Sequence, residues 1–233
     1  MKQKIAYTAA AKLIKDGMKI GLGTGSTARW LISWLKEKTE AKVLKNILIV
    51  PTSEDTRLNC EKEGLPVTTL SDPRIASRLD LTIDGADEID EQARLIKGGG
   101  GALLIEKIIA ASSGCYAIIA EAHKLVKNLG TNFWVPVEII PAALPLILNK
   151  LKDLGVKQTR LRQAPGFCGP LFSQHGNFIL DANFGPILEP EKMEKELKLI
   201  PGVVESGIFT LRVDYLFLGF PDGRIEERRP FLR

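Results

Sequence analysis

Residues 21–27 form a glycine-rich segment with three hydroxyl side chains, between a short apolar run and an expected helix. Glycine lets the backbone approach a ligand closely, and the free N–H groups at a helix start favour an anion. The hydroxyls of Thr24, Ser26 and Thr27 suit phosphate oxygens. The third glycine of a dinucleotide fingerprint would fall at Ser26, and the lysine of a Walker loop is missing. The segment therefore predicts an anion site of another kind, with a tight turn without ligand as the alternative.

Residues 84–90 contain four carboxylates directly after an apolar run. In open parallel sheets, ligands bind beyond the carboxyl ends of the strands, so this segment is a second candidate site. Calcium binding is one alternative, but the EF-hand spacing fails because Glu88 would take the fifth position and the distal glutamate is absent. A plain acidic turn is the other alternative.

Lys97 is followed by four consecutive glycines and then by an expected helix that carries Glu106. Four glycines in succession are conformationally expensive, so a bare connecting loop explains them poorly and a backbone wrapped around a substrate explains them better. Glu106 falls about two helical turns further on, where a carboxylate near a cation and a sugar carbon can act as a general base. A role for Glu106 on the helix surface stays open from the residues alone.

The elements that position these segments alternate between strand and helix. We expect strands at 18–22, 47–50, 67–70, 79–83 and 116–120. We expect helices up to Gly17, at about 28–35, after Thr52 with Asp55 as a capping pair, and at about 102–112. Strands that are apolar throughout and interleaved with helices predict an α/β fold with a Rossmann-like parallel sheet.

The pattern changes after about residue 132. We expect a helix at 142–154, strands at 157–162 and 177–181, a helix at 190–199 and a strand at 203–209. This order predicts a second, smaller α+β domain of the ferredoxin-like kind. Residues 213–220 are apolar enough to return to the first sheet. We therefore expect a Rossmann-like catalytic domain of residues 1–130 and 208–233, and a small α+β domain of residues 131–207.

Composition and charge exclude several classes of protein. Hydrophobic residues make up 45% of the 233 residues, and no apolar run approaches the roughly 20 residues of a membrane span. The N-terminus has no apolar signal region or cleavage site, so we expect a cytoplasmic protein that does not bind membranes. The net charge is +4, and the basic residues are scattered except for Arg224, Arg228, Arg229 and Arg233. This distribution suits anionic metabolites, or merely a slightly basic surface, better than a nucleic acid.

The cysteines and histidines speak against metal and disulfide chemistry. Cys60, Cys115 and Cys168 are far apart and form no CxxC pair, and only two histidines are present. A disulfide framework and a zinc site are therefore not expected. We expect no metal and no cofactor, so that carboxylates, lysine, hydroxyls and backbone groups carry the chemistry.

Five stretches together carry a family resemblance. They are 23–27 (GTGST), 83–89 (IDGADEI), 96–100 (IKGGG) with 106–110 (EKIIA), 136–141 (PVEIIP) and 200–207 (IPGVVESG). In this order and spacing they resemble type A ribose-5-phosphate isomerase over nearly the whole chain. The resemblance implies an aldose-ketose isomerase of the non-oxidative pentose phosphate pathway. Its reaction interconverts D-ribose 5-phosphate and D-ribulose 5-phosphate through a cis-enediol.

The resemblance also implies a role for each matching residue. Glu106 would move the proton between C1 and C2. Asp84 would assist ring opening and shuttle protons among sugar oxygens, while Asp87 holds hydroxyls. Lys97 and neighbouring N–H groups would stabilise the enediolate. The residues implied to bind the sugar phosphate are Thr24, Gly25, Ser26, Thr27, Asp84, Gly85, Ala86, Asp87, Lys97, Gly98, Gly99, Gly100 and Lys124, the last as a cationic partner of the phosphate. A homodimer is implied as well.

The chain departs from the family pattern at three places. Glu121 and His123 stand where Asp and Ser are common, and Gln3 stands where the first of two lysines is common. Both departures touch expected phosphate contacts. Residues 173–177 (SQHGN) replace Thr-Asp-Asn-Gly-Asn in the small domain, where we expect an effect on packing only.

Other functions are weighed against this one. A sugar-phosphate deaminase or a coenzyme A transferase is the nearest enzyme alternative, but a ring-opening deaminase needs a differently placed acid and histidine set, and neither histidine is near the glycine loops. A sugar-phosphate-sensing regulator would carry a helix-turn-helix domain, for which no room precedes the first strand. An inactive sensor with the same pocket is a further alternative, against which the retained acids and Lys97 speak.

Overall fold

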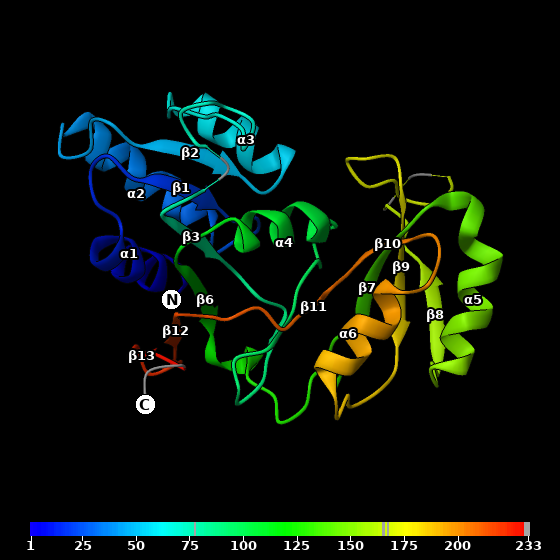
Figure 1. Ribbon diagram of the computed structural model, residues 1–233. Helices are drawn as coiled ribbons and strands as arrows, with labels where there is room; N and C mark the ends of the chain where they lie inside the picture. Colours follow the sequence, from blue (N-terminus) through cyan, green and yellow to red (C-terminus); the bar gives the residue numbers. More distant parts are fainter. Residues whose placement is uncertain (77, 165, 167, 231–233) are drawn as a thin grey trace. The chain divides into compact units, whose positions relative to one another are not determined.

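The computed structural model describes residues 1–76, 78–164, 166 and 168–230, and the chain divides into two compact units (Figure 1). Unit 1 consists of Met1–Ala86, Ile105–Lys124 and Leu211–Arg233. Unit 2 consists of Asp87–Leu104 and Leu125–Thr210. Each unit has a hydrophobic core of its own.

Unit 1 is a parallel α/β structure. Its elements are α1 (Lys2–Leu13), β1 (Lys19–Leu22), α2 (Arg29–Glu40), β2 (Leu48–Pro51), α3 (Glu54–Lys62), β3 (Leu81–Asp84), most of α4 (Leu103–Ala111), β6 (Tyr116–Glu121), the short 3-10 helix η1 (Ala122–Lys124), β12 (Tyr215–Gly219) and β13 (Ile225–Arg228). The sheet has the order β13-β12-β6-β3-β1-β2, and only the edge strand β13 is antiparallel. The predicted fold class is confirmed in this unit, and β12 is the expected returning strand.

The parallel sheet forms because its strands can be buried on both faces. β3 is buried at all four positions, and β6 at its first five. The helices present small or branched apolar residues at helical spacing, such as Ile5 and Ala9 on α1 and Leu31 and Leu35 on α2. Burial of apolar surface contributes about 25 cal/mol per Å², so these faces hold the strands in place.

Unit 2 is a separate antiparallel structure. Its elements are β4 (Glu88–Ile89), β5 (Leu95–Ile96), β7 (Val135–Ile139), the 3-10 helix η2 (Pro141–Ala143), α5 (Leu144–Asp153), β8 (Gln158–Leu161), β9 (Phe178–Asn183), α6 (Pro190–Lys198), β10 (Val203–Ser206) and β11 (Ile208–Phe209). One sheet has the order β10-β7-β9-β8, and a smaller one has the order β11-β5-β4. The chain order β7-α5-β8-β9-α6-β10 is the ferredoxin-like arrangement that the sequence predicts, with β7 added.

Two of the predicted strands were wrong, and the strand β7 was not predicted. Residues 67–70 form only an isolated bridge from Val67 to Ile49, and the strand expected at 203–209 is divided between two sheets. The division falls at Gly207, where a Cβ would lie 2.3 Å from the carbonyl oxygen of Lys97. The strand β7 was missed because Pro136 signals a break. In the structure Pro136 lies opposite Asp181 of β9 and its carbonyl accepts from the N–H of Gly207, so the strand continues through a residue that has no N–H to donate.

The two units differ from the predicted domains. Residues 87–104 belong to unit 2, because β5 pairs with β11 through Ile96 and Ile208. Residues 125–130 also belong there, where Leu129 forms a bridge with Ile187. These pairings join segments far apart along the chain, so sequence periodicity does not reveal them.

The basic cluster near the end of the chain is paired with acids. Arg224 and Arg228 both form ion pairs with Glu226, and Arg229 pairs with Glu227. Arg233 lies outside the described residues. Within the described part of the chain, no helix combines the length and the apolar character that crossing a membrane requires.

Candidate active site

The glycine segment and the first acid of the acidic segment meet at the carboxyl ends of β1 and β3. Asp84 is buried, and its Oδ1 accepts hydrogen bonds from the N–H groups of Thr24 (3.2 Å) and Gly85 (2.7 Å). A Cβ at Gly23 would lie 2.1 Å from the same oxygen, so only glycine fits. Two motifs that are 60 residues apart are therefore one structural feature of unit 1.

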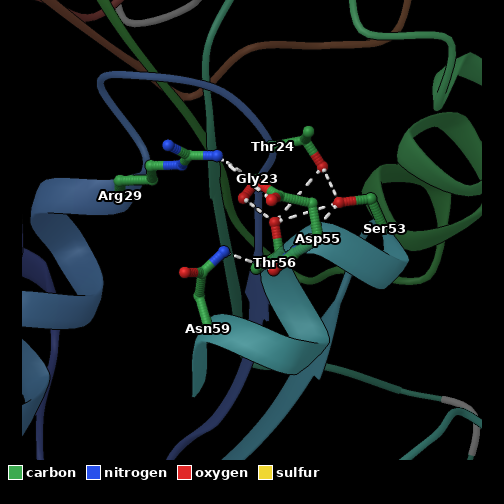
Figure 2. A network of polar contacts seen from close by, with 7 residues as sticks. All are labelled: Gly23, Thr24, Arg29, Ser53, Asp55, Thr56 and Asn59. Carbon is green, nitrogen blue, oxygen red and sulfur yellow. Dashed lines mark hydrogen bonds and ion pairs between the residues drawn. The ribbon is translucent and has the colours of Figure 1, made fainter. Parts of the chain in front are cut away.

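The hydroxyl of Thr24 belongs to a hydroxyl cluster at the start of α3. Figure 2 shows it with Ser53 and Thr56, and the hydroxyl of Thr52 is a further member. Thr24 Oγ1 lies 2.8 Å from Thr52 Oγ1 and donates to Ser53 Oγ at 2.7 Å. Thr56 Oγ1 donates to the carbonyl oxygen of Gly23 at 3.0 Å. The cluster ties the glycine segment to α3, so the Thr24 hydroxyl, predicted as a phosphate donor, already has partners within the unit.

The predicted capping pair of α3 was wrong by one position. Ser53 is the N-cap, and its Oγ accepts from the N–H of Thr56 at 3.1 Å. Asp55 forms an ion pair with Arg29 on α2 instead, as Figure 2 shows. Thr52 takes part in the hydroxyl cluster.

Removing the Thr56 hydroxyl is expected to destabilise unit 1. Thr56→Val keeps the shape of the side chain but leaves the buried Gly23 carbonyl without its donor, which costs about 1–3 kcal/mol. Thr56→Ser keeps the hydroxyl and loses one methyl group, about 1 kcal/mol. Urea unfolding followed by circular dichroism measures both. A valine variant as stable as the wild type would contradict the assigned bond.

Two lysines of unit 1 lie toward this edge of the sheet. Lys124 closes η1, directly after β6 and thus at the carboxyl end of the strand beside β3. Lys2 on α1 donates to Ser26 Oγ at 2.8 Å and lies 4.0 Å from Glu121 Oε2. Lys4 donates instead to the carbonyl oxygen of Gly223. Sequence reasoning missed Lys2, because only the packing of α1 against β6 and β12 brings it to the glycine segment.

Glu106 lies on the side of α4 that faces the sheet. It is only 5% exposed. Ile109, three residues on and hence on the same helical face, packs so closely on β1 that a Cβ at Gly21 would lie 2.5 Å from its Cγ2. The N–H of Leu79, just before β3, donates to the carbonyl of Ser112 at the end of α4. The helix therefore runs opposite to the strands, and Glu106 is displaced toward the carboxyl ends where Asp84 lies.

The second acid and the Lys97 segment come together in unit 2. The N–H of Asp87 donates to the carbonyl of Ile96, and Asp87 Oδ2 accepts from the N–H of Gly99 at 2.8 Å. A Cβ at Gly99 would lie 2.8 Å from Asp87 Oδ1, and Gly98 has a φ of +98°. The buried Lys97 places its Nζ 5.6 Å from the ring centre of Phe209. Gly99 is thus required by its close approach to the Asp87 carboxylate, and Gly98 by its left-handed backbone conformation.

The other two acids of residues 84–90 have structural partners. Glu88 is buried and accepts hydrogen bonds from the N–H groups of Gly130, Asn132 and Phe133. Asp90 is also buried and forms an ion pair with Arg94. Among the described residues, no group of three histidine, cysteine or acidic side chains is arranged to hold a metal ion. Of the four neighbouring acids, Glu88 and Asp90 therefore have structural roles, while Asp84 and Asp87 contact the two glycine segments.

The comparisons with known proteins agree on one family. The model of the family ribose 5-phosphate isomerase A (phosphoriboisomerase A) matches residues 48–223. A ribose-5-phosphate isomerase A of Treponema denticola is 44% identical over 97% of this chain and 98% of that protein. The chain belongs to the ribose 5-phosphate isomerase A family. This membership favours the isomerase over the deaminase, transferase and regulator alternatives.

Solved structures of this family have the same fold. A D-ribose-5-phosphate isomerase in complex with phospho-erythronic acid is 38% identical, with a TM-score of 0.92 over 98% of this chain and 97% of that one. The ribose 5-phosphate isomerase A of Methanocaldococcus jannaschii is 37% identical, with a TM-score of 0.90 over the same shares.

The departures from the family pattern lie in different surroundings. Ser173 Oγ and Asn177 Nδ2 both donate to Oε1 of the buried Glu138, at 2.6 and 2.9 Å, which ties both ends of residues 173–177 to β7 in unit 2, while Gln174 and His175 between them are exposed. Glu121 lies beside Lys2, and His123 is exposed.

Two of the three cysteines, Cys60 and Cys115, have thiols with raised pKa values. Burial raises the pKa of the Cys60 thiol to about 12, and burial with the neighbouring Asp214 raises the pKa of Cys115 to about 11. Both are protonated at neutral pH, and the thiolate is the reactive form.

Proposed function

We propose that this chain interconverts D-ribose 5-phosphate and D-ribulose 5-phosphate through a cis-enediol, with no metal ion and no organic cofactor. Family membership supports the reaction. The observation that carries the choice of base is the buried, sheet-facing Glu106 at the carboxyl side of the sheet that holds Asp84. Phospho-erythronic acid, bound by a related isomerase, supports the same chemistry. Its carboxylate is planar, carries two oxygens and is negatively charged, as the O1–C1–C2–O2 group of an enediolate is.

The proposed reaction moves one carbon-bound proton, from C2 to C1, and one hydroxyl proton, from O2 to O1. After ring opening, assisted by Asp84, the Glu106 carboxylate takes the proton from C2 of the aldose. The electron pair of that C–H bond forms the C1=C2 double bond, and the carbonyl π pair moves to O1. Lys97 and glycine N–H groups stabilise the negative oxygen. Asp84 carries a proton from O2 to O1. The electron pair left on O2 forms the C2=O2 carbonyl, and the C1=C2 pair takes the proton from Glu106 at C1, which gives the ketose.

The phosphate does not react and needs only to be held. The exposed Ser26 and the half-buried Thr27 offer hydroxyls, since Thr24 is engaged by the α3 cluster. Lys124 and Lys2 supply positive charge at the same edge of unit 1. Gln3 occupies a position where lysine is common in the family. In this proposal Lys2 supplies the positive charge that such a lysine would provide. Asp87 holds hydroxyls of the sugar.

The direct test is conversion of ribose 5-phosphate by protein stripped of metal with EDTA. We expect ketose to form at the same rate before and after chelation. Loss of activity that one divalent ion restores would overturn the metal-free part of the proposal. Absence of conversion under every condition would overturn the function.

Two substitutions separate binding from chemistry. Thr27→Ala and Lys124→Ala should raise KM by roughly ten- to a hundredfold, since a hydrogen bond to a charged group contributes about 1.5–3 kcal/mol. Because the phosphate is unchanged in the reaction, kcat should stay within about threefold. Steady-state kinetics measure both, with Lys127→Ala at an exposed position as the matched control. A large fall in kcat at constant KM would place these residues at the reacting carbons instead.

We also propose a cytoplasmic homodimer. The homodimer rests on the family resemblance. Light scattering after size-exclusion chromatography should give about twice the mass of 25.6 kDa.

A further inference from the structure

The glycine loop after Lys97 is held from one side by an arginine that sequence reasoning missed. We call residues 98–101 the tetraglycine loop. Arg162, directly after β8, donates from Nη1 to the carbonyl oxygens of Gly98 (2.8 Å) and Gly99 (3.0 Å). Its side chain is only 15% exposed. A largely buried guanidinium that binds two successive carbonyls further restricts a glycine backbone that the Gly99–Asp87 and Gly101–Gly98 hydrogen bonds already hold in part.

The guanidinium is itself oriented by a buried carboxylate. Arg162 Nε donates to Asp181 Oδ2 at 3.1 Å, and Nη2 binds Asp181 Oδ1. Asp181 lies in the middle of β9 and is buried. The backbone of Arg162 is held as well, because its N–H donates to the carbonyl of Ile179 and its carbonyl accepts from Leu171. Arginine suits this place because its planar fork meets the carboxylate and the loop carbonyls at once.

These bonds determine where the loop N–H groups point. Peptide bonds of the described residues are not cis, and in a trans peptide the C=O and N–H point in opposite directions. Because the carbonyl of Gly99 points to Arg162, the N–H of Gly100 points away from it. The N–H of Gly99 is taken by Asp87, and that of Gly101 by the carbonyl of Gly98. The N–H of Gly100 is therefore directed to the side of the loop opposite to the arginine.

We propose that Arg162, oriented by Asp181, is a positioning residue that fixes the tetraglycine loop so that the Gly100 N–H stabilises the enediolate oxygen. Arg162 itself does not touch the substrate in this proposal. The inference rests on the proposed isomerase function, since the loop N–H groups matter for catalysis only if an oxyanion forms. A simpler alternative is an ion pair that only joins β8 to β9.

Arg162→Lys tests the proposal with the charge retained. A lysine ends in one ammonium group and cannot bridge the carboxylate and both carbonyls. Loss of a preorganised oxyanion donor typically costs about 10²–10³ in kcat, and a loosened donor should cost less. We therefore expect kcat to fall about ten- to a hundredfold, with KM within about threefold of the wild type. The dissociation constant of phospho-erythronic acid should rise by about the same factor as kcat/KM falls.

Arg160→Lys is the matched control. Arg160 lies two residues earlier on β8, is 71% exposed, and lies 3.8 Å from Asp181 without a described contact to the tetraglycine loop. Its variant should keep kcat within about twofold. Asp181→Asn should also lower kcat, but by less than Arg162→Lys does, because the arginine is retained and only its orientation is less well fixed.

Amide hydrogen exchange of peptides that contain residues 98–101 gives a readout independent of activity. Exchange should be faster in Arg162→Lys than in the wild type and unchanged in Arg160→Lys. Unchanged exchange, or kcat within twofold of the wild type, would overturn the inference, as would a fall in activity that matches the fraction of unfolded protein. If the wild type does not isomerise the sugar, the proposed function fails, whereas the exchange result still shows whether Arg162 holds the loop.

Discussion

Glu106→Gln is expected to lower kcat by about 10²–10⁴-fold while ribose 5-phosphate still binds. The substitution keeps the size and hydrogen bonding of the side chain but removes its ability to accept a proton at neutral pH. Because Glu106 is buried on the sheet-facing side of α4, solvent does not readily replace it as the base. Steady-state kinetics in both directions measure the effect.

Solvent exchange distinguishes a lost base from a disturbed helix. The wild type should incorporate deuterium from D₂O at the transferred carbon to some extent, and Glu106→Gln should show neither conversion nor exchange. Glu106→Asp keeps a carboxylate at a shorter reach and should retain more activity than the glutamine variant. If Glu106→Gln keeps more than about a tenth of the wild-type kcat, the general-base contribution is too small for this role and Asp84 becomes the leading candidate.

Glu88→Ala is expected to cause a large loss of stability, about 3–5 kcal/mol in the free energy of unfolding. The buried Glu88 carboxylate accepts three backbone hydrogen bonds, from Gly130, Asn132 and Phe133. Each hydrogen bond to a charged group contributes about 1.5–3 kcal/mol, and their loss leaves buried donors without partners. The effects are not additive, hence the lower total. Urea unfolding gives the free energy.

The neighbouring Glu91 supplies the control for this change. It is exposed, and Glu91→Ala should alter stability by no more than about 0.5 kcal/mol. Glu88→Gln, which keeps an acceptor oxygen, should fall between the two alanine variants and provides the measurement if Glu88→Ala does not fold. Similar stabilities for Glu88→Ala and Glu91→Ala would contradict the structural role of Glu88.

Features that depend on neighbouring residues could be predicted from the sequence. Apolar runs such as 79–83 and 116–120 predicted parallel strands, because a strand buried on both faces needs apolar side chains throughout. The glycines around Thr24 and after Lys97 predicted that the backbone approaches another group closely. In the structure Gly23 lies close to the Asp84 carboxylate, and Gly99 lies close to the Asp87 carboxylate. The motif order also identified the family, and with it the expected role of Glu106.

The pairing of distant segments was decided by the tertiary structure alone. Asp84 and Glu88 are close along the sequence, but their side chains have different partners in the fold. Asp84 accepts a hydrogen bond from the N–H of Thr24 in the glycine segment, whereas Glu88 accepts from backbone N–H groups of residues 130–133. No local pattern brings Lys2 to Ser26, or Arg162 to Gly99, since these contacts join residues 24 and 63 positions apart. The short strands β4, β5 and β11 form for the same reason. A two-residue strand has too few side chains to show a period, and it persists only because a distant partner supplies its hydrogen bonds.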